Sequence, residues 1–260
     1  MEAGIVRDVL TVLAGVGTGV LSGAFGVGGA VVSTPTVRAL GLSPLLAVGT
    51  TLPSILPSAL SGALRYHRER LVMWRVVLVS APPGVAAAVA GSVATRRVPG
   101  EGHLLMVITA LLLGYTAVRT AWRPPAPRRR DEGERPRTLL IAGVGVLAGL
   151  LSGLLGLGGG LVLVPGFMAA AGMPIKAAIA TSLACVAVLA VPSTISHALQ
   201  GGIDWRVALL LAVGVIPGAR LGAAATVRAG ERRLRLAVAV GLGAIALVYL
   251  IGELNALRAS

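Results

Sequence analysis

Apolar residues fill most of this chain in long stretches, and charged residues are confined to the intervals between them. Several of these stretches exceed the roughly 20 residues that a helix needs to cross about 30 Å of hydrocarbon. The pattern predicts an all-α polytopic membrane protein, because a soluble chain needs far more polar surface. The stretches without Asp, Glu, Lys or Arg are 9–37, 42–64, 76–95, 104–118, 138–175, 177–203, 207–219 and 236–252.

A glycine-dense block interrupts one apolar stretch in each half of the chain. Residues 21–30 read LSGAFGVGGA, and residues 151–160, which lie 130 positions later, read LSGLLGLGGG. Pro35 and Pro165 follow the two blocks at the same distance. Such a repetition predicts a transporter built from two related halves. Further blocks that keep this order are 50–52 with 181–183, 74–76 with 205–207, and 83–84 with 217–218.

Each half is predicted to contain four apolar elements, the first of which is broken by glycine. Glycine costs about 1 kcal/mol per residue in a helix interior, so a cluster of glycines ends the helix locally. In the first half we expect a helix to about Phe25, a break at Gly26 to Gly29, a short helix to about Leu40, and helices near 43–64, 72–94 and 103–121. In the second half we expect a helix to about Leu155, a break at Gly156 to Gly160, a short helix to about Ala170, and helices near 173–198, 204–226 and 235–251.

Residues 123–137 form the one clear linker, with four prolines, six arginines and three acids. Proline and like charge resist both helix formation and membrane entry, so this segment is expected to be a solvated loop. The predicted organisation is a first membrane repeat at 1–122, the linker at 123–137 and a second membrane repeat at 138–260. Together the repeats are expected to form one transport domain.

The arginines favour a topology, because basic loops lie on the cytoplasmic side of a membrane. The linker is the most basic segment, which predicts that it is cytoplasmic in a multi-pass protein of the inner (plasma) membrane. If the broken first elements are re-entrant, each half crosses three times and the halves are inverted, with both termini outside. If they cross fully, the arginine cluster at 228–235 falls outside. We favour the inverted arrangement. Arg96 and Arg97 fall on the side opposite to the cytoplasm in both arrangements.

Composition and charge reduce the number of function classes that fit this chain. The net charge of +13 comes from 22 arginines and one lysine against ten acids, but aromatic residues make up only 3%. Basic loops of a membrane protein account for this charge, and no nucleic-acid partner is expected. A lone Cys185, three scattered histidines and no His-Glu-x-x-His helix predict neither an enzyme nor a metal or cofactor site.

The glycine breaks are the candidate substrate site. A helix that starts after a break points free backbone N–H groups and a positive dipole end at it, and glycine lets an anion approach closely. Two such breaks that meet near the midplane would bind an anion through backbone amides. The alternative is that these glycines only let helices pack. The candidate residues are Gly26, Gly28, Gly29, Ala30, Thr50, Thr51, Gly156, Gly158, Gly159, Gly160, Thr181, Ser182 and Arg220.

The acids support an anionic substrate by their positions. Cation sites and proton relays in membrane transporters usually use buried Asp or Glu. Here all ten acids lie in termini, in loops or near predicted helix ends. The expected partners are therefore a small anion and the lipid bilayer.

The chain resembles the TauE/SafE family of sulfite exporter-like membrane proteins. The resemblance rests on the repeated LSGxxGxGG blocks at 21–29 and 151–159 with their prolines, the TTL and TSL blocks at 50–52 and 181–183, and the PGARLG block at 217–222. It implies an inner-membrane permease for sulfite, sulfonates or related small anions. Ala30 departs from the third glycine of the block, so the first break is expected to be less open than the second. A passive anion channel and a non-transporting membrane scaffold remain as alternatives.

Overall fold

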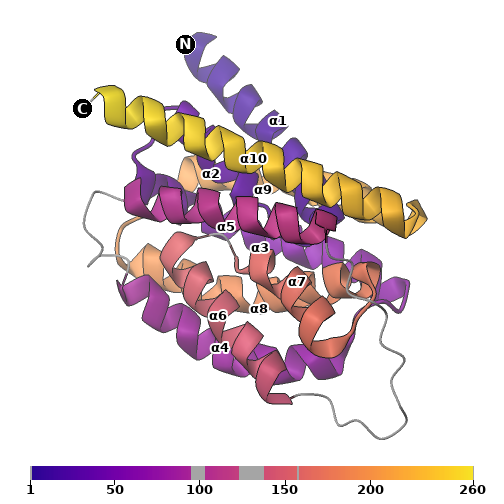
Figure 1. Cartoon of the computed structure of the whole chain (residues 1–260). Helices are drawn as coiled ribbons and strands as arrows, with labels where there is room; N and C mark the ends of the chain where they lie inside the picture. The colour runs from indigo at the N-terminus through magenta and orange to yellow at the C-terminus, as the bar shows by residue number, and fades with distance from the viewer. Residues whose placement is uncertain (1, 95–102, 123–137, 157, 260) are drawn as a thin grey trace, which may run out of the picture.

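The computed structural model describes residues 2–94, 103–122, 138–156 and 158–259, and this part of the chain folds into α-helices without any strand (Figure 1). The helices are α1 (Glu2–Phe25), α2 (Ala30–Ala39), α3 (Pro44–Arg68), α4 (Trp74–Ala94), α5 (His103–Trp122), α6 (Thr138–Leu155), α7 (Gly160–Ala171), α8 (Ile175–Leu199), α9 (Trp205–Arg228) and α10 (Glu231–Ala259).

Six of these helices are long and apolar enough to cross a membrane: α1, α4, α6, α8, α9 and α10. Their outer faces carry large apolar side chains such as Leu78, Leu209 and Val240, which are 71%, 64% and 70% exposed. Hydrocarbon solvates such a surface well, whereas water does not. The prediction of an all-α polytopic membrane protein is therefore confirmed.

The first helix of each half packs along the third element of the other half, where the broken first element counts as one. On α1, side-chain atoms added to Gly15, Gly19 and Gly23 would collide with the backbone of α9, in order along both helices, so the two helices run parallel. On α6, Gly145, Gly149 and Gly153 meet the backbone of α4 in the same way. Small residues allow this close approach, which favours helix association in a membrane. The partner residues are Leu211, Val215 and Ala219 of α9, and Ser80, Gly84 and Ala88 of α4.

The second long helices of the two halves, α3 and α8, lie together at the centre. Gly49 near the start of α3 lies beside His197 near the end of α8, and Gly62 lies beside Leu183. These contacts show that α3 and α8 run antiparallel. The last helices, α5 and α10, pack against each other, and Figure 1 shows them lying across the front of the bundle.

Several arginines lie in helices rather than in the loops that the sequence predicts. Arg65 and Arg68 belong to the last turns of α3, and Arg232, Arg233 and Arg235 belong to the start of α10. Arginine is a good helix former, and its long side chain can reach the polar interface from a helix end. Both helices therefore extend beyond the predicted apolar segments. Residues 96, 97 and 123–137, on which the predicted topology also depends, lie outside the described residues.

Candidate functional site

The first candidate segment joins α1 to α2. Helix α1 ends at Phe25, and the backbone then adopts positive φ at Gly26, Gly28 and Gly29, with φ values of 73°, 88° and 87°. Residues with a Cβ rarely adopt this region, so consecutive glycines make the turn possible. Gly29 is the N-cap of α2, and Ala30 is its first residue.

The second candidate segment joins α6 to α7 and has positive φ at the matched glycines. Helix α6 ends at Leu155, and φ is 65° at Gly156, 71° at Gly158 and 70° at Gly159. Gly159 is the N-cap of α7, which begins at Gly160. Both breaks therefore end in a new helix whose first amides face the break.

The two breaks touch each other. A Cβ added to Gly160 would collide with the carbonyl oxygen of Gly26 and would lie 2.6 Å from the Cα of Val27. Matched segments from the two halves of the chain thus meet at one point inside the bundle. The central helices line this point, because Gly158 faces Ile55 of α3 and Val186 of α8.

Several backbone amides at the two breaks donate to no acceptor in the described part of the chain. They belong to Gly28, Gly29 and Ala30 in the first break, and to Gly158, Gly159 and Gly160 in the second. The first hydrogen bonds of each short helix start beyond them, from Val32 to Gly29 and from Val162 to Gly159. A buried N–H without an acceptor costs free energy, so these amides are ready to bind an acceptor such as an anion.

A hydroxyl group of the central helix α8 also reaches the first break. The Ser182 hydroxyl, which has one hydrogen to donate, lies 2.8 Å from the Gly26 carbonyl oxygen and 2.9 Å from the Ile179 carbonyl oxygen of its own helix. Thr51 occupies the matched place on α3, and its hydroxyl donates to the Val48 carbonyl at 3.0 Å. Ser182 therefore ties the first break directly to the other half of the chain.

Thr50 and Thr181 make a different kind of contact. The Thr50 hydroxyl accepts the backbone N–H of Asp204 at 2.9 Å, and the Thr181 hydroxyl accepts that of Met73 at 3.0 Å. Asp204 precedes α9 and Met73 precedes α4, so each threonine holds the approach to a helix of the opposite half. These two hydroxyls fasten the halves together.

Arg220 lies apart from the other candidates. Its side chain is exposed on α9 beside the exposed residues Ile216 and Leu221, whereas the twelve other candidate residues are buried. The structure therefore does not bring Arg220 to the two breaks. Because Gly218 and Ala219 occupy the face of α9 that packs on α1, residue 220 is turned outward.

Two side chains that the sequence does not single out cap the helices that lead into the breaks. The Tyr66 hydroxyl donates to the Gly23 carbonyl at 2.7 Å, and His197 Nε2 lies 3.4 Å from the Gly153 carbonyl. The last carbonyls of a helix have no partner within the helix, so both contacts satisfy groups that the breaks leave open. Tyr66 and His197 occupy matched positions, because they are displaced along the chain just as the threonine blocks are. That shared displacement is the signal that could have identified them.

A buried hydroxyl also lies beside the first break. Thr18 Oγ1 has no hydrogen-bond partner among the described residues, and the Thr18 methyl group would lie 3.1 Å from a Cβ on Gly29. The neighbouring Ser22 hydroxyl accepts from Ser58 at 2.9 Å. The second break has an alanine, Ala148, where the first has Thr18, so the two breaks differ in the donors around them.

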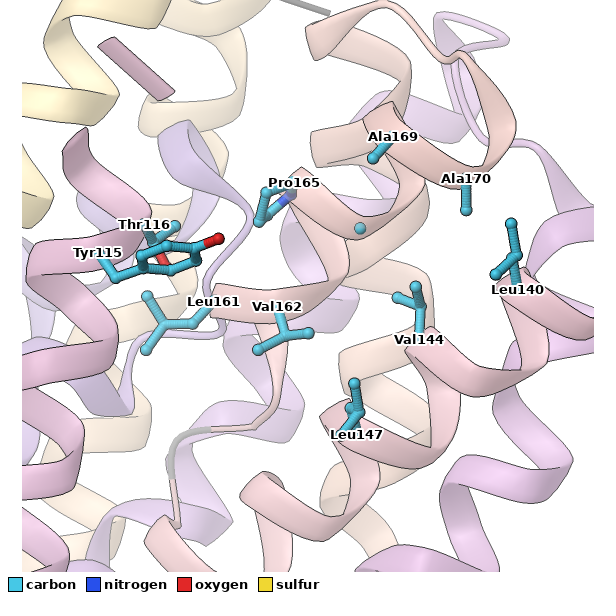
Figure 2. Close-up of a pocket in the computed structure, with 11 residues that line it drawn as sticks. Tyr115, Thr116, Leu140, Val144, Leu147, Leu161, Val162, Pro165, Ala169 and Ala170 are labelled. Carbon is cyan, nitrogen blue, oxygen red and sulfur yellow. The ribbon is translucent and has the colours of Figure 1, made fainter. Parts of the chain in front are cut away.

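An apolar cleft of about 320 Å³ lies between α5, α6 and α7. Figure 2 shows Tyr115 and Thr116 of α5 next to Leu161 and Pro165 of α7, with side chains of α6 on the opposite side. In the other half, the cavity between α10, α1 and α2 measures about 10 Å³. No charged residue lines the larger cleft, and an apolar wall does not compensate an anion for its lost hydration. The lining of this cleft therefore offers an anion little compensation for its lost hydration.

Known proteins match this chain over nearly its whole length. The model of the family described as sulfite exporter TauE/SafE matches residues 11–249. A probable membrane transporter protein of Xylella fastidiosa (strain 9a5c) is 28% identical over 247 residues, which are 94% of each chain. The probable membrane transporter protein YunE of Bacillus subtilis (strain 168) is 28% identical over 238 residues, 83% of this chain and 87% of its own. One from Methanocaldococcus jannaschii is 23% identical over 258 residues, 93% of this chain and 95% of its own. No solved structure matches the chain.

Proposed function

The chain belongs to the sulfite exporter TauE/SafE family of membrane transporters, and we propose that it carries a small sulfur-containing anion, sulfite or an organosulfonate, across the inner membrane. The anion binds where the two glycine breaks meet, through backbone amides at the starts of α2 and α7. No catalytic residue, cofactor or metal takes part. The observation that carries this proposal is the set of buried amides at both breaks that have no acceptor in the described residues.

The electrostatics of the breaks suit an anion. Each short helix directs the positive end of its dipole at its own break, and the breaks touch, so two positive ends meet at one place. The described residues contain no group of three or more His, Cys, Asp or Glu side chains that could hold a metal ion. A small oxyanion presents several acceptor oxygens, which matches a cluster of N–H donors.

The proposal includes an inverted relation between the two halves. It is supported by the antiparallel packing of the matched helices α3 and α8, and by the reciprocal packing of α1 on α9 and of α6 on α4. A pseudo-two-fold axis in the membrane plane produces both arrangements. Such a relation places the two breaks around one central site and gives each side of the membrane an equivalent route to it.

The topology gives a direct test. With re-entrant first elements, a reporter fused to either terminus will be read outside the cell, and a reporter inserted into the 123–137 linker will be read in the cytoplasm. Helices α1 and α6 are themselves long enough to cross the membrane. A cytoplasmic reading at the N-terminus therefore means that they cross fully and contradicts the re-entrant arrangement.

Flux measurements test the function itself. We expect purified protein in liposomes to carry labelled sulfite, methanesulfonate or sulfoacetate, and to carry acetate and chloride poorly, with a rate that responds to an imposed pH gradient. Flux that ignores the gradient would identify a passive anion channel. Liposomes that carry none of these anions faster than protein-free liposomes would contradict transport and leave a membrane scaffold.

A further inference from the structure

Two hydroxyl-bearing residues of α1 face the start of α2. Thr18 and Ser22 lie four residues apart and therefore share one face of the helix. A Cβ added to Gly29 would lie 3.1 Å from the methyl carbon of Thr18 and 3.6 Å from the hydroxyl oxygen of Ser22. Because Gly29 has no side chain, the N-cap of α2 lies directly against this face of α1.

The Thr18 hydroxyl is the unsatisfied member of this pair. The Ser22 hydroxyl accepts from Ser58 at 2.9 Å, whereas Thr18 Oγ1 is buried and has no hydrogen-bond partner among the described residues. A threonine in a helix often donates to a carbonyl of the preceding turn, as Thr11 does to Arg7 at 2.8 Å. Thr18 does not make this bond, which leaves its hydrogen available to a ligand.

The Thr18 hydroxyl lies within reach of the space next to Gly29. Threonine carries its methyl and hydroxyl groups on one carbon, and in helices it occupies more than one χ1 rotamer. A change of rotamer therefore turns the oxygen toward Gly29, where the methyl group now lies. The cavity of about 10 Å³ beside this point, whose lining includes Ser22, Phe25, Val27 and Gly29, has room for about one water molecule or one anion oxygen.

The other unsatisfied groups at this point are donors as well. The backbone amides of Gly28, Gly29 and Ala30 donate to no acceptor in the described part of the chain. The Gly29 carbonyl already accepts the amides of Val32 and Ser33 at 3.0 Å and 3.3 Å. The positive end of the α2 dipole lies at the same place. One oxyanion, which has several acceptor oxygens, can satisfy these amides and the α1 hydroxyl together.

The second break lacks this hydroxyl. The residues of α6 that match Thr18 and Ser22 are Ala148 and Ser152, each displaced by 130 positions. A Cβ added to Gly159 would lie 3.1 Å from the side chain of Ala148, so the matched position also faces its break. At this matched face the two halves differ by one donor, which favours stronger anion binding at the first break.

We propose that Thr18 binds the transported anion through its hydroxyl and makes the first break the stronger half of the anion site. The hydroxyl donates to one oxygen of the anion while the amides of the first break donate to the others, and no covalent bond forms or breaks. An anion with several oxygens meets both sets of donors at once, which favours a sulfonate or sulfite over chloride. This inference rests on the proposed anion transport.

The experiment separates binding from stability. Thr18→Val keeps the shape of the side chain and removes only the hydroxyl. We expect the concentration of labelled methanesulfonate that half-saturates uptake into liposomes to rise at least about tenfold, because a hydrogen bond to a charged group is lost. The melting temperature without the anion should stay equal or rise, since an unpaired buried hydroxyl is removed. Thr18→Ser keeps the hydroxyl and should restore wild-type half-saturation.

Thr11 provides the matched control on the same helix. It is as buried as Thr18, but its hydroxyl already donates to the Arg7 carbonyl, so Thr11→Val should leave half-saturation unchanged. Wild-type half-saturation in Thr18→Val overturns the inference about Thr18 alone. A lower melting temperature of this variant without the anion, or its failure to fold, assigns the hydroxyl to the fold and overturns the inference as well. The absence of methanesulfonate uptake by the wild-type protein overturns the proposed function instead.

Discussion

Gly149→Val will lower the melting temperature of the transporter by roughly 10 °C, whereas Gly143→Val on the same helix will leave it unchanged. A Cβ on Gly149 would collide with the carbonyl oxygen of Gly84 and would lie 2.8 Å from its Cα. These are backbone atoms of α4, so no side chain can swing away to make room. Overpacking a tight core costs about 1–3 kcal/mol and sometimes more, and we expect at least ~3 kcal/mol here. For a protein of this size, that corresponds to a loss of roughly 10 °C in melting temperature.

The control uses the same substitution on the same helix. A Cβ added to Gly143 would have no atom within 4 Å, and Gly143 is exposed. The other half offers a second matched pair, because Gly19 of α1 meets the backbone of Val215 while Gly17 meets nothing within 4 Å. The measurement is the fraction of monodisperse protein in detergent after heating. A wild-type melting curve for Gly149→Val would show that the close approach of α4 and α6 is not required.

The sequence separates the two glycines in this test but does not name their partner. Gly149 shares a four-residue spacing with Gly145 and Gly153, which Gly143 does not, and this spacing indicates a helix-packing face. The partner helix α4 belongs to the other half of the chain. Contacts between distant segments follow from the fold rather than from local pattern. Helices α1 and α6 end at Phe25 and Leu155, directly before a glycine, and glycine ends a helix by a local effect.

The difference between local pattern and contacts between distant segments also explains which site residues the sequence predicts. Gly26 and Gly156 stand out because they belong to a repeated motif whose chemistry depends on the backbone. Tyr66 and His197 do not stand out, because their residue types differ and each caps a carbonyl on a helix that is distant in the sequence. Arg220 was predicted from its depth in an apolar segment, but depth along a helix does not say which way the side chain points.

Gly160→Ala will reduce anion flux at least about tenfold while leaving a folded protein, and Ala30→Gly will preserve flux. The new methyl group at position 160 would collide with the Gly26 carbonyl and lie 2.7 Å from the carbonyl carbon of Val27, so the two breaks must separate. Gly160 is not among the positive-φ glycines, and alanine favours a helix start, so the helix itself is not strained. A tenfold loss corresponds to about 1.4 kcal/mol of binding free energy, which is the order expected when one charge-assisted hydrogen bond is lost.

Ala30→Gly makes the reverse exchange at the matched position, where the first short helix begins. It removes a buried methyl group and adds none, so the contact between the breaks is kept, and the expected cost is about 1 kcal/mol of helix stability. Flux of labelled methanesulfonate and the melting temperature should be measured on both variants. If Gly160→Ala lowers the melting temperature as much as Gly149→Val does, the break acts mainly in packing. If it keeps both its stability and its flux, the two breaks do not need to touch for the anion to bind. The predicted combination, lost flux in Gly160→Ala alone with a smaller loss of melting temperature than in Gly149→Val, separates a binding role from a packing role for the same glycine.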